Sequence, residues 1–288
     1  MRGRGKTKVR GYVVATLTVL MGWSCLPDPL EVRNIPPLKP EIVVNTQIIP
    51  DESLVVFLTK TFGALEASDD SNPFELINAI AVNDATVILD GPTSSDTLQL
   101  LGAGAYGGLE LTFNAGDVYT LRVISPSMGT VQATTTVTPR VEFESLSLRR
   151  YFNGYDDTLV QVSYSIKDPL ERNFYMINVQ RLRLQNEIPE QLLNPRVYTR
   201  VIDDSGYDGM VITDTLHATP RDYAAGDTVA VFLSNIQEDY YDFIKLRLDN
   251  RMGFVEFVSE PVNYPTNVEG GRGFFNLYIP DVRLFVVE

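Results

Sequence analysis

Three aspartates lie in one glycine-containing loop, at Asp203, Asp204 and Asp208. Carboxylate oxygens are ligands that Ca²⁺ prefers in proteins, so this loop is a candidate cation site. Its spacing does not match the EF-hand pattern, and Gly206 and Gly209 are equally suited to a solvated turn. The solvated turn is the favoured interpretation, and a structural or adventitious cation is the alternative. A catalytic carboxylate pair for glycoside hydrolysis is disfavoured, because among 37 acidic residues some pair meets the required spacing by chance.

Two other motifs contain residues typical of catalysis or cofactor binding, but their sequence context does not fit those functions. Residues 102–107 spell G-x-G-x-x-G, but residues 109–113 alternate as a strand instead of opening the helix that a dinucleotide site needs. We expect a glycine-rich hairpin there. His217 is the single histidine and follows Asp214 within an expected strand, and the chain has no G-x-S-x-G elbow. His217 is therefore interpreted as a structural or surface residue, and the prediction is a protein without catalytic residues or cofactors.

The segment N-V-E-G-G-R-G-F-F at residues 267–275 is the most distinctive part of the sequence. Three glycines in four residues allow positive φ angles and close approach of another backbone. One interpretation is a crowded turn that packs against the helix expected around Tyr240 to Phe243, and this is favoured. The alternative is a ligand or partner site formed by Asn267, Gly270, Gly271, Arg272, Gly273 and Phe274.

The single cysteine, Cys25, ends an expected export signal. Five basic residues within the first ten positions are followed by an apolar run over 12–23 and by Ser24, which is the layout of a secretory signal. The run is shorter than the about 20 residues that span a bilayer as a helix. The letters M-G-W-S-C at 21–25 resemble a bacterial lipobox, although Gly22 replaces the usual Leu and Trp23 is bulky. We expect residues 1–24 to be removed and acyl chains on Cys25 to anchor the protein to a membrane. The alternative is a leader that is cut elsewhere, with Cys25 incidental.

Composition excludes several classes of function. The chain has 24 Lys and Arg against 37 Asp and Glu, for a formal charge of −13. Removal of residues 1–24 takes five basic residues and leaves a charge of −18. Such an acidic excess argues against nucleic acid as a partner, because binding to phosphates depends on cationic side chains. One His and one Cys also exclude a zinc ribbon, a Cys/His protease and a disulfide framework.

The expected elements are mostly strands. Short β-branched and aromatic runs separated by Gly, Pro, Asn and Asp predict an all-β protein of sandwich or barrel type. Two helices are expected, one over 73–81 and one near 235–250, where Ser234 and Gln237 have the spacing of a capping box. A boundary near 138–140 divides a domain over 41–139 from a second over 140–288, and a Pro-rich tether over 25–40 precedes both.

Several motifs together resemble a known family. They are I-V-V-N-T at 42–46, V-N-D-A-T-V at 82–87, A-G-D-V-Y-T-L-R-V at 115–123 and D-D-S-G-Y-D-G at 203–209, with Q-E-D-Y-Y-D-F at 237–243 paired with the glycine-rich segment at 267–275. The chain resembles the Bacteroidota outer-membrane lipoproteins of domain of unknown function family 4249, whose genes typically lie beside genes for TonB-dependent receptors. The resemblance implies an N-terminal immunoglobulin- or transthyretin-like β-sandwich, followed by a second β-rich, sandwich-like domain that carries one helix. It implies no catalytic residues.

Three functions stay open at this point. The first is a non-enzymatic, lipid-anchored accessory or binding protein that works with a TonB-dependent transporter. The second is a surface adhesin or structural envelope lipoprotein. The third, and least favoured, is an enzyme that processes carbohydrate or peptide.

Overall fold

The computed structural model describes residues 39–49, 53–62, 73–109, 112–154, 158–182, 197–218, 223–249 and 264–288. All of them belong to one unit, Lys39–Glu288, which is separate from residues 1–38. The predicted signal, the lipidation site Cys25 and most of the Pro-rich tether therefore lie outside the described residues.

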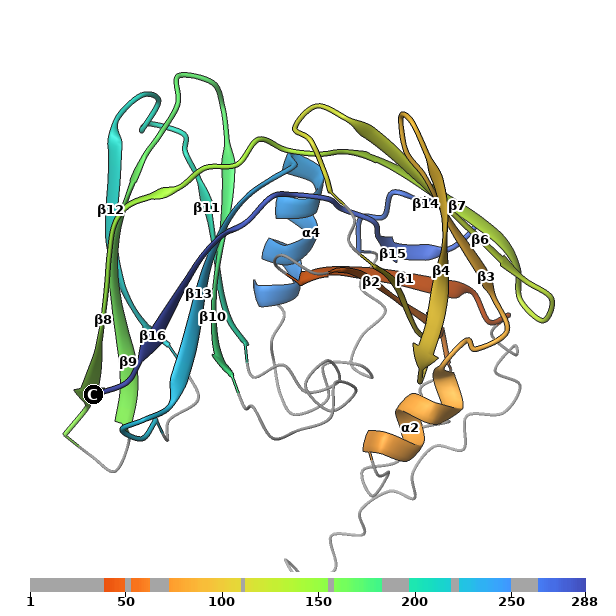
Figure 1. Ribbon diagram of the computed structural model, residues 1–288, viewed down its shortest axis with the longest axis horizontal. Coiled ribbons are helices and arrows are strands. Elements are labelled where there is room, and N and C mark those ends of the chain that lie inside the picture. The colour runs from red at the N-terminus through yellow and green to blue at the C-terminus, as the bar shows by residue number, and fades with distance from the viewer. Residues whose placement is uncertain are drawn as a thin grey trace, which may run out of the picture. The chain divides into compact units, whose positions relative to one another are not determined.

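The first sandwich is built from seven strands and one helix (Figure 1). They are β1 (Ile42–Ile49), β2 (Ser53–Lys60), α2 (Pro73–Ile80), β3 (Thr86–Asp90), β4 (Ser95–Gly102), β5 (Ala105–Leu109), β6 (Val118–Ser125) and β7 (Gly129–Thr136). The strands are hydrogen-bonded in the order β7-β6-β3-β4-β5-β2-β1, so β4 joins the two layers. Burial alternates along β6 and β7, because side chains of successive strand residues point to opposite faces. The inward residues, such as Leu54, Leu121 and Val123, form the first core.

The second sandwich has a three-stranded sheet, β12-β9-β8, and a four-stranded sheet, β11-β10-β13-β16. Its strands are β8 (Phe143–Phe152), β9 (Thr158–Lys167), β10 (Phe174–Leu182), β11 (Val197–Asp203), β12 (Val211–Ala218), β13 (Thr228–Ile236) and β16 (Asp281–Val286). Three strands facing four are typical of an immunoglobulin-like sandwich. Val160, Tyr164, Ile177 and Val231 are among the residues of its core. The predicted all-β fold with two sandwiches is confirmed.

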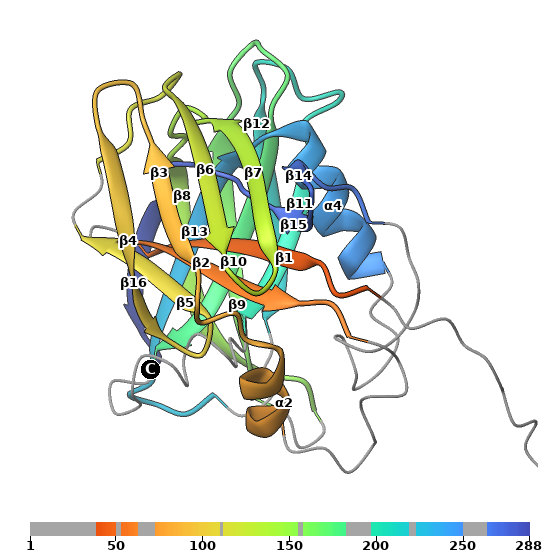
Figure 2. The same ribbon diagram turned by 90° about the vertical axis from the view of Figure 1, so that its right-hand side faces the viewer.

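The connection from β13 to β16 returns to the first sandwich. It contains α4 (Glu238–Asp249), β14 (Val268–Glu269) and β15 (Arg272–Phe274). Strand β14 pairs antiparallel with β7, and β15 pairs parallel with β1. Figure 2 draws both short strands near α4. Val268, Phe275 and Leu277 enter the first core. We call residues 264–279 the return segment. The first core thus contains residues from both sides of the expected boundary near 138–140.

The two predicted helices are present, but α4 begins later than expected. Helix α2 covers Pro73–Ile80, in agreement with the prediction. The capping box at Ser234 is wrong, because β13 continues to Ile236, which pairs with Phe174 on β10. The first helical hydrogen bond instead runs from the Tyr241 N–H to the Gln237 carbonyl at 2.9 Å. Neither α2 nor α4, the helices of the described residues, is long and apolar enough to cross a membrane.

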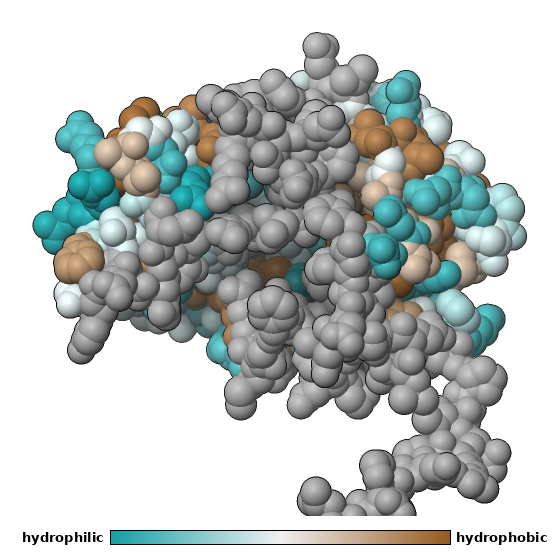
Figure 3. All heavy atoms as spheres, turned by 90° about the horizontal axis from the view of Figure 1, so that it is seen from below, coloured by the Kyte–Doolittle hydropathy of each residue, from teal (hydrophilic) through white to brown (hydrophobic). Residues whose placement is uncertain are grey.

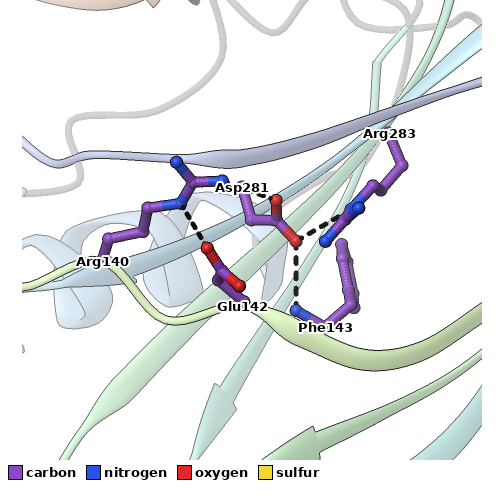
Figure 4. Close-up of polar contacts among 5 residues, drawn as sticks. All are labelled: Arg140, Glu142, Phe143, Asp281 and Arg283. Atoms are coloured by element: carbon purple, nitrogen blue, oxygen red, sulfur yellow. Dashed lines mark hydrogen bonds and ion pairs between the residues drawn. The ribbon is translucent and has the colours of Figure 1, made fainter.

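One buried carboxylate joins the first and last strands of the second sandwich. Asp281, which starts β16, accepts hydrogen bonds from Arg140 at 2.9 Å, from the Phe143 backbone N–H at 3.1 Å and from Arg283 at 3.2 Å (Figure 4). Its side chain is 2% exposed, whereas both arginine side chains are about half exposed. Glu142 lies 3.4 Å from Arg140 on the outside of this group. Asp281 therefore fixes the entry of the chain into β8.

We expect Asp281→Asn to lower the free energy of unfolding by about 1.5–3 kcal/mol, because it removes charge-assisted hydrogen bonds while preserving shape. Urea denaturation measures the change. Glu142→Gln is the matched control: its side chain is 61% exposed, and its pair with Arg140 is expected to contribute less than about 1 kcal/mol. Equal effects of the two substitutions would contradict the role assigned to Asp281.

Candidate functional site

A cluster of three aspartates lies where two loops of the second sandwich meet. Asp168 follows β9, and Asp204 and Asp208 lie between β11 and β12. One carboxylate oxygen from each lies within 4.8 Å of the other two. Asp168 is 2% exposed and Asp204 is fully buried, whereas Asp208 is exposed. Among the residues that the structure describes, this is the only group of His, Cys, Asp or Glu side chains close enough to share a metal ion.

The sheet topology brings the two loops together. Strand β9 pairs antiparallel with β12, so the end of β9 lies beside the start of β12. The Asp168 N–H donates to the Met210 carbonyl at 2.9 Å, and the Gly209 N–H donates to the Pro169 carbonyl at 3.1 Å. Strand β11 ends at Asp203, so the next residue, Asp204, lies beside Asp168 and Asp208. The cluster therefore depends on contacts between segments that are distant in sequence.

The two buried carboxylates differ in their hydrogen bonding. Asp168 accepts hydrogen bonds from the Tyr175 hydroxyl and, at 3.3 Å, from the Gly209 backbone N–H. Asp204 accepts one from the Asn173 backbone N–H through Oδ2. Its other oxygen, Oδ1, is one of four buried side-chain polar atoms without a hydrogen-bond partner in the described part of the chain.

In this cluster, burial and the neighbouring negative charges both raise the pKa of Asp204. Burial raises the pKa of Asp204 above its usual range, and the negative charges of Asp168, Asp208 and Asp203 raise it further. Burial, together with the hydrogen bond to Asp168, also raises the pKa of Tyr175. The Tyr175 hydroxyl therefore keeps its proton and stays a donor to Asp168. The arrangement concentrates negative charge at a place where two of the three carboxylates are buried.

The structure changes the membership of the predicted acidic site. It brings Asp204 and Asp208 together with Asp168, and it leaves Asp203 outside, 3.6 Å from the Arg172 guanidinium. Sequence reasoning missed Asp168, which lies directly after the alternating strand that ends at residue 167. The position of Asp168 at the end of β9 would have pointed to the acidic site only if the pairing of β9 with β12 had been known.

The glycines of the return segment lie against the backbone of the first sandwich. A Cβ on Gly273, whose φ is +92°, would lie 1.9 Å from the Val44 carbonyl oxygen. A Cβ on Gly271 would lie 2.6 Å from the Ile42 carbonyl oxygen, and one on Gly270 would lie 3.2 Å from the Thr130 carbonyl oxygen. The glycines are therefore explained by the close approach of β14 and β15 to their partner strands.

Asn267 closes the return segment on itself. Its side-chain Nδ2 donates to the Phe275 backbone carbonyl at 2.7 Å, and its side-chain Oδ1 accepts from the Phe275 backbone N–H at 2.9 Å. Phe274 is 2% exposed and packs with Tyr240 and Phe243 of α4, with ring centroids 5.3 and 5.2 Å apart.

Arg272 has a different environment: it is exposed and pairs with Glu41 at 2.6 Å. Each of the six residues named as a possible contact site thus has an intramolecular neighbour. A ligand or partner contact through them stays a prediction.

The G-x-G-x-x-G motif and His217 are not part of the aspartate cluster. Residues 102–107 form the turn between β4 and β5 and the start of β5, so the predicted glycine-rich hairpin is confirmed. His217 is exposed on β12, and its ring centroid lies 4.5 Å from that of Tyr151. Asp214 contacts the Tyr164 hydroxyl at 3.5 Å and Arg200 at 3.9 Å.

Fold and topology define a tandem β-sandwich protein in which the last connection of the second sandwich completes the first. The chain belongs to the family described as "Domain of unknown function (DUF4249)", whose model matches residues 29–281. Membership of domain of unknown function family 4249, which the sequence motifs predicted, is therefore confirmed. No curated protein matches this sequence.

Two solved structures illustrate how distant the structural likenesses are. A two-domain fibronectin type-III segment of chicken tenascin is 9% identical, with a TM-score of 0.22, over 85% of this chain and 99% of that one. The chicken interferon gamma receptor alpha chain is 8% identical, with a TM-score of 0.19, over 69% of this chain and 90% of that one. At such TM-scores neither likeness carries an argument, and the fold assignment depends on the sheet topology.

Proposed function

We propose that this protein is a non-enzymatic accessory of a TonB-dependent transport system, anchored to the outer membrane of a Bacteroidota cell by acyl chains on Cys25. The observation that carries the proposal is the position of the single cysteine. It ends an apolar leader, and the family domain begins only four residues later, at residue 29. The anchor thus directly precedes the domain that it would hold.

The anchor would act by confinement. Residues 25–40 contain five prolines, which favour an extended conformation of about 3 Å per residue. Such a tether keeps the sandwiches within about 50 Å of the membrane surface. A partner in the same membrane would then meet an effective concentration in the millimolar range, so that even a weak contact would be populated.

The charge of the protein supports attachment through acyl chains instead of through charged lipid headgroups. With residues 1–24 removed the formal charge is −18, which repels an anionic lipid surface. On the face drawn in Figure 3, hydrophobic and hydrophilic residues are interspersed over the described part of the chain. These features support a water-exposed body that reaches its transporter through the lipid anchor and through protein contacts.

The experiment is recovery of the tagged protein from native membranes in mild detergent. We expect the wild type to partition into a detergent phase and to bring a TonB-dependent receptor with it in stoichiometric amount. Cys25→Ala is expected to partition into the aqueous phase and to lose the receptor, because at least two acyl chains are needed for stable anchoring.

Ser24→Ala is the control for this experiment, since it changes the same leader, keeps a small residue before the cysteine and leaves Cys25 in place. It should behave as the wild type. Recovery of the wild-type protein alone, under conditions in which known transporter complexes survive, would contradict the accessory role. That result would favour an adhesin or a structural envelope lipoprotein.

A further inference from the structure

We propose that Asp168, Asp204 and Asp208 bind a divalent cation, Ca²⁺, which fastens the β9–β10 loop to the β11–β12 loop of the second sandwich. The proposal is independent of the membrane anchor and of any transporter. Its geometric basis is the convergence of three carboxylate oxygens within 4.8 Å, two of them from buried side chains.

The unpartnered oxygen of Asp204 is the second observation. A buried polar atom normally has a hydrogen-bond partner, because removing it from water without one is costly. Asp204 Oδ2 is satisfied by the Asn173 N–H, but Oδ1 is buried without a hydrogen-bond partner and belongs to a carboxylate of the cluster. Arg172, a basic side chain beside this loop, contacts Asp203 and Glu238. A cation among the three carboxylates would supply the partner that Oδ1 lacks.

The chemistry of the cluster favours Ca²⁺ over other divalent ions. Its side chains offer only oxygen, whereas Zn²⁺ prefers nitrogen and sulfur ligands. Ca²⁺ takes 6–8 oxygen ligands in flexible geometry, and the exposed position of Asp208 leaves room for water to complete the shell. Mg²⁺ demands a stricter octahedron. The Tyr175 hydroxyl and the Gly209 N–H hold Asp168 in place, which is the role of groups just outside the ligand shell.

A chain of hydrogen bonds leads from the cluster to the link between the sandwiches. The backbone of Asn173 donates to Asp204, and its side-chain oxygen accepts from the Asn235 amide at 2.9 Å. The Asn235 carbonyl accepts from the Thr138 hydroxyl at 2.5 Å, just before the chain enters β8. Ordering of the two loops by Ca²⁺ is therefore expected to stabilise the second sandwich as a whole, and not the loops alone.

The test is a titration of the purified full chain with CaCl₂ after removal of metals with a chelator. Calorimetry is expected to give one site with a Kd of about 10⁻⁴–10⁻³ M, the range of extracellular calcium modules. At a hundredfold excess of Ca²⁺ over the Kd, the melting temperature should rise by about 5–10 °C. Tb³⁺, which replaces Ca²⁺ at oxygen sites, should show luminescence excited through nearby tyrosines such as Tyr175 and Tyr207.

Single substitutions separate a specific site from general charge effects. Asp204→Asn and Asp168→Asn should abolish the calcium-dependent heat and the rise in melting temperature. In chelator, Asp204→Asn should melt at or above the wild-type temperature, because the new amide can donate to the neighbouring carboxylates in place of the unpartnered oxygen. This outcome would show that the variant folds and that its lost response reflects lost binding.

Asp203→Asn is the matched control, since it removes the same charge from the adjacent residue outside the cluster. It should keep the calcium response. The proposal is overturned if the wild type shows neither heat nor thermal shift with CaCl₂ far above the expected Kd. It is equally overturned if Asp203→Asn and Asp204→Asn lose the response to the same extent, or if MgCl₂ binds and CaCl₂ does not.

Discussion

Gly273→Ala is expected to lower the free energy of unfolding by more than about 4 kcal/mol, a loss seen only where a substitution is incompatible with the native packing. The added Cβ would lie 1.9 Å from the Val44 carbonyl oxygen, and 2.8 and 2.9 Å from the Val44 carbonyl carbon and amide nitrogen. All three are backbone atoms of β1, which cannot move without breaking the β1–β15 pairing. The positive φ of +92° adds strain for any residue with a side chain. Guanidinium denaturation of the purified variant measures the loss.

Gly226→Ala separates the steric effect from the backbone strain. Gly226 has a φ of +91°, almost the same as Gly273, but a Cβ there would meet nothing within 4 Å. Its substitution should therefore show only the cost of the left-handed conformation, about 1–2 kcal/mol. If the two variants lost the same free energy, the close approach of β15 to β1 would not be what constrains residue 273.

Phe275→Ala is expected to cost about 3–5 kcal/mol, as is typical for removal of a buried aromatic ring. Phe275 is fully buried in the core of the first sandwich, although it lies in the connection between two strands of the second. The cavity left by the ring would lie among residues of β1–β7. The free energy of unfolding from denaturant titration should fall, and amide hydrogen exchange should speed up in the first sandwich.

The same substitution at an exposed site is the control. Phe152, at the end of β8, is 60% exposed, so Phe152→Ala should change the free energy of unfolding by less than about 0.5 kcal/mol. A similar loss at both positions, or faster exchange confined to the second sandwich in Phe275→Ala, would contradict the assignment of the return segment to the first core.

The strand content of this protein could be predicted because it is encoded locally. In β6, Tyr119, Leu121 and Val123 alternate with less buried residues, and the same period of two appears in the sequence itself. Helix α2 was also predictable, since Pro73 stands at its first position. The start of α4 was not, because the pairing of Ile236 with Phe174 extends β13 past the apparent cap. Tertiary pairing there prevails over a local signal.

The candidate site could be predicted only in part for a similar reason. Asp204 and Asp208 share a loop and attracted notice as a cluster, but Asp168 joins them through the pairing of β9 with β12. Strand pairing across long sequence separations leaves no trace in a single sequence. In the return segment the glycines indicated a close approach, yet the partner strand of Gly273 was not apparent from its neighbours.

The return segment also decides when the protein can finish folding. Thr46 and Asn276 are 230 positions apart and are joined by a buried hydrogen bond between the Thr46 hydroxyl and the Asn276 carbonyl at 3.2 Å. A ribosome delivers the N-terminal strands first, but their core lacks Phe275 and Leu277 until nearly the whole chain has been made. The residues of the first sandwich are thus complete only shortly before β16, the last strand of the second, and its closing contacts are among the slowest to form. During synthesis the chain therefore has an extended interval without a finished N-terminal core.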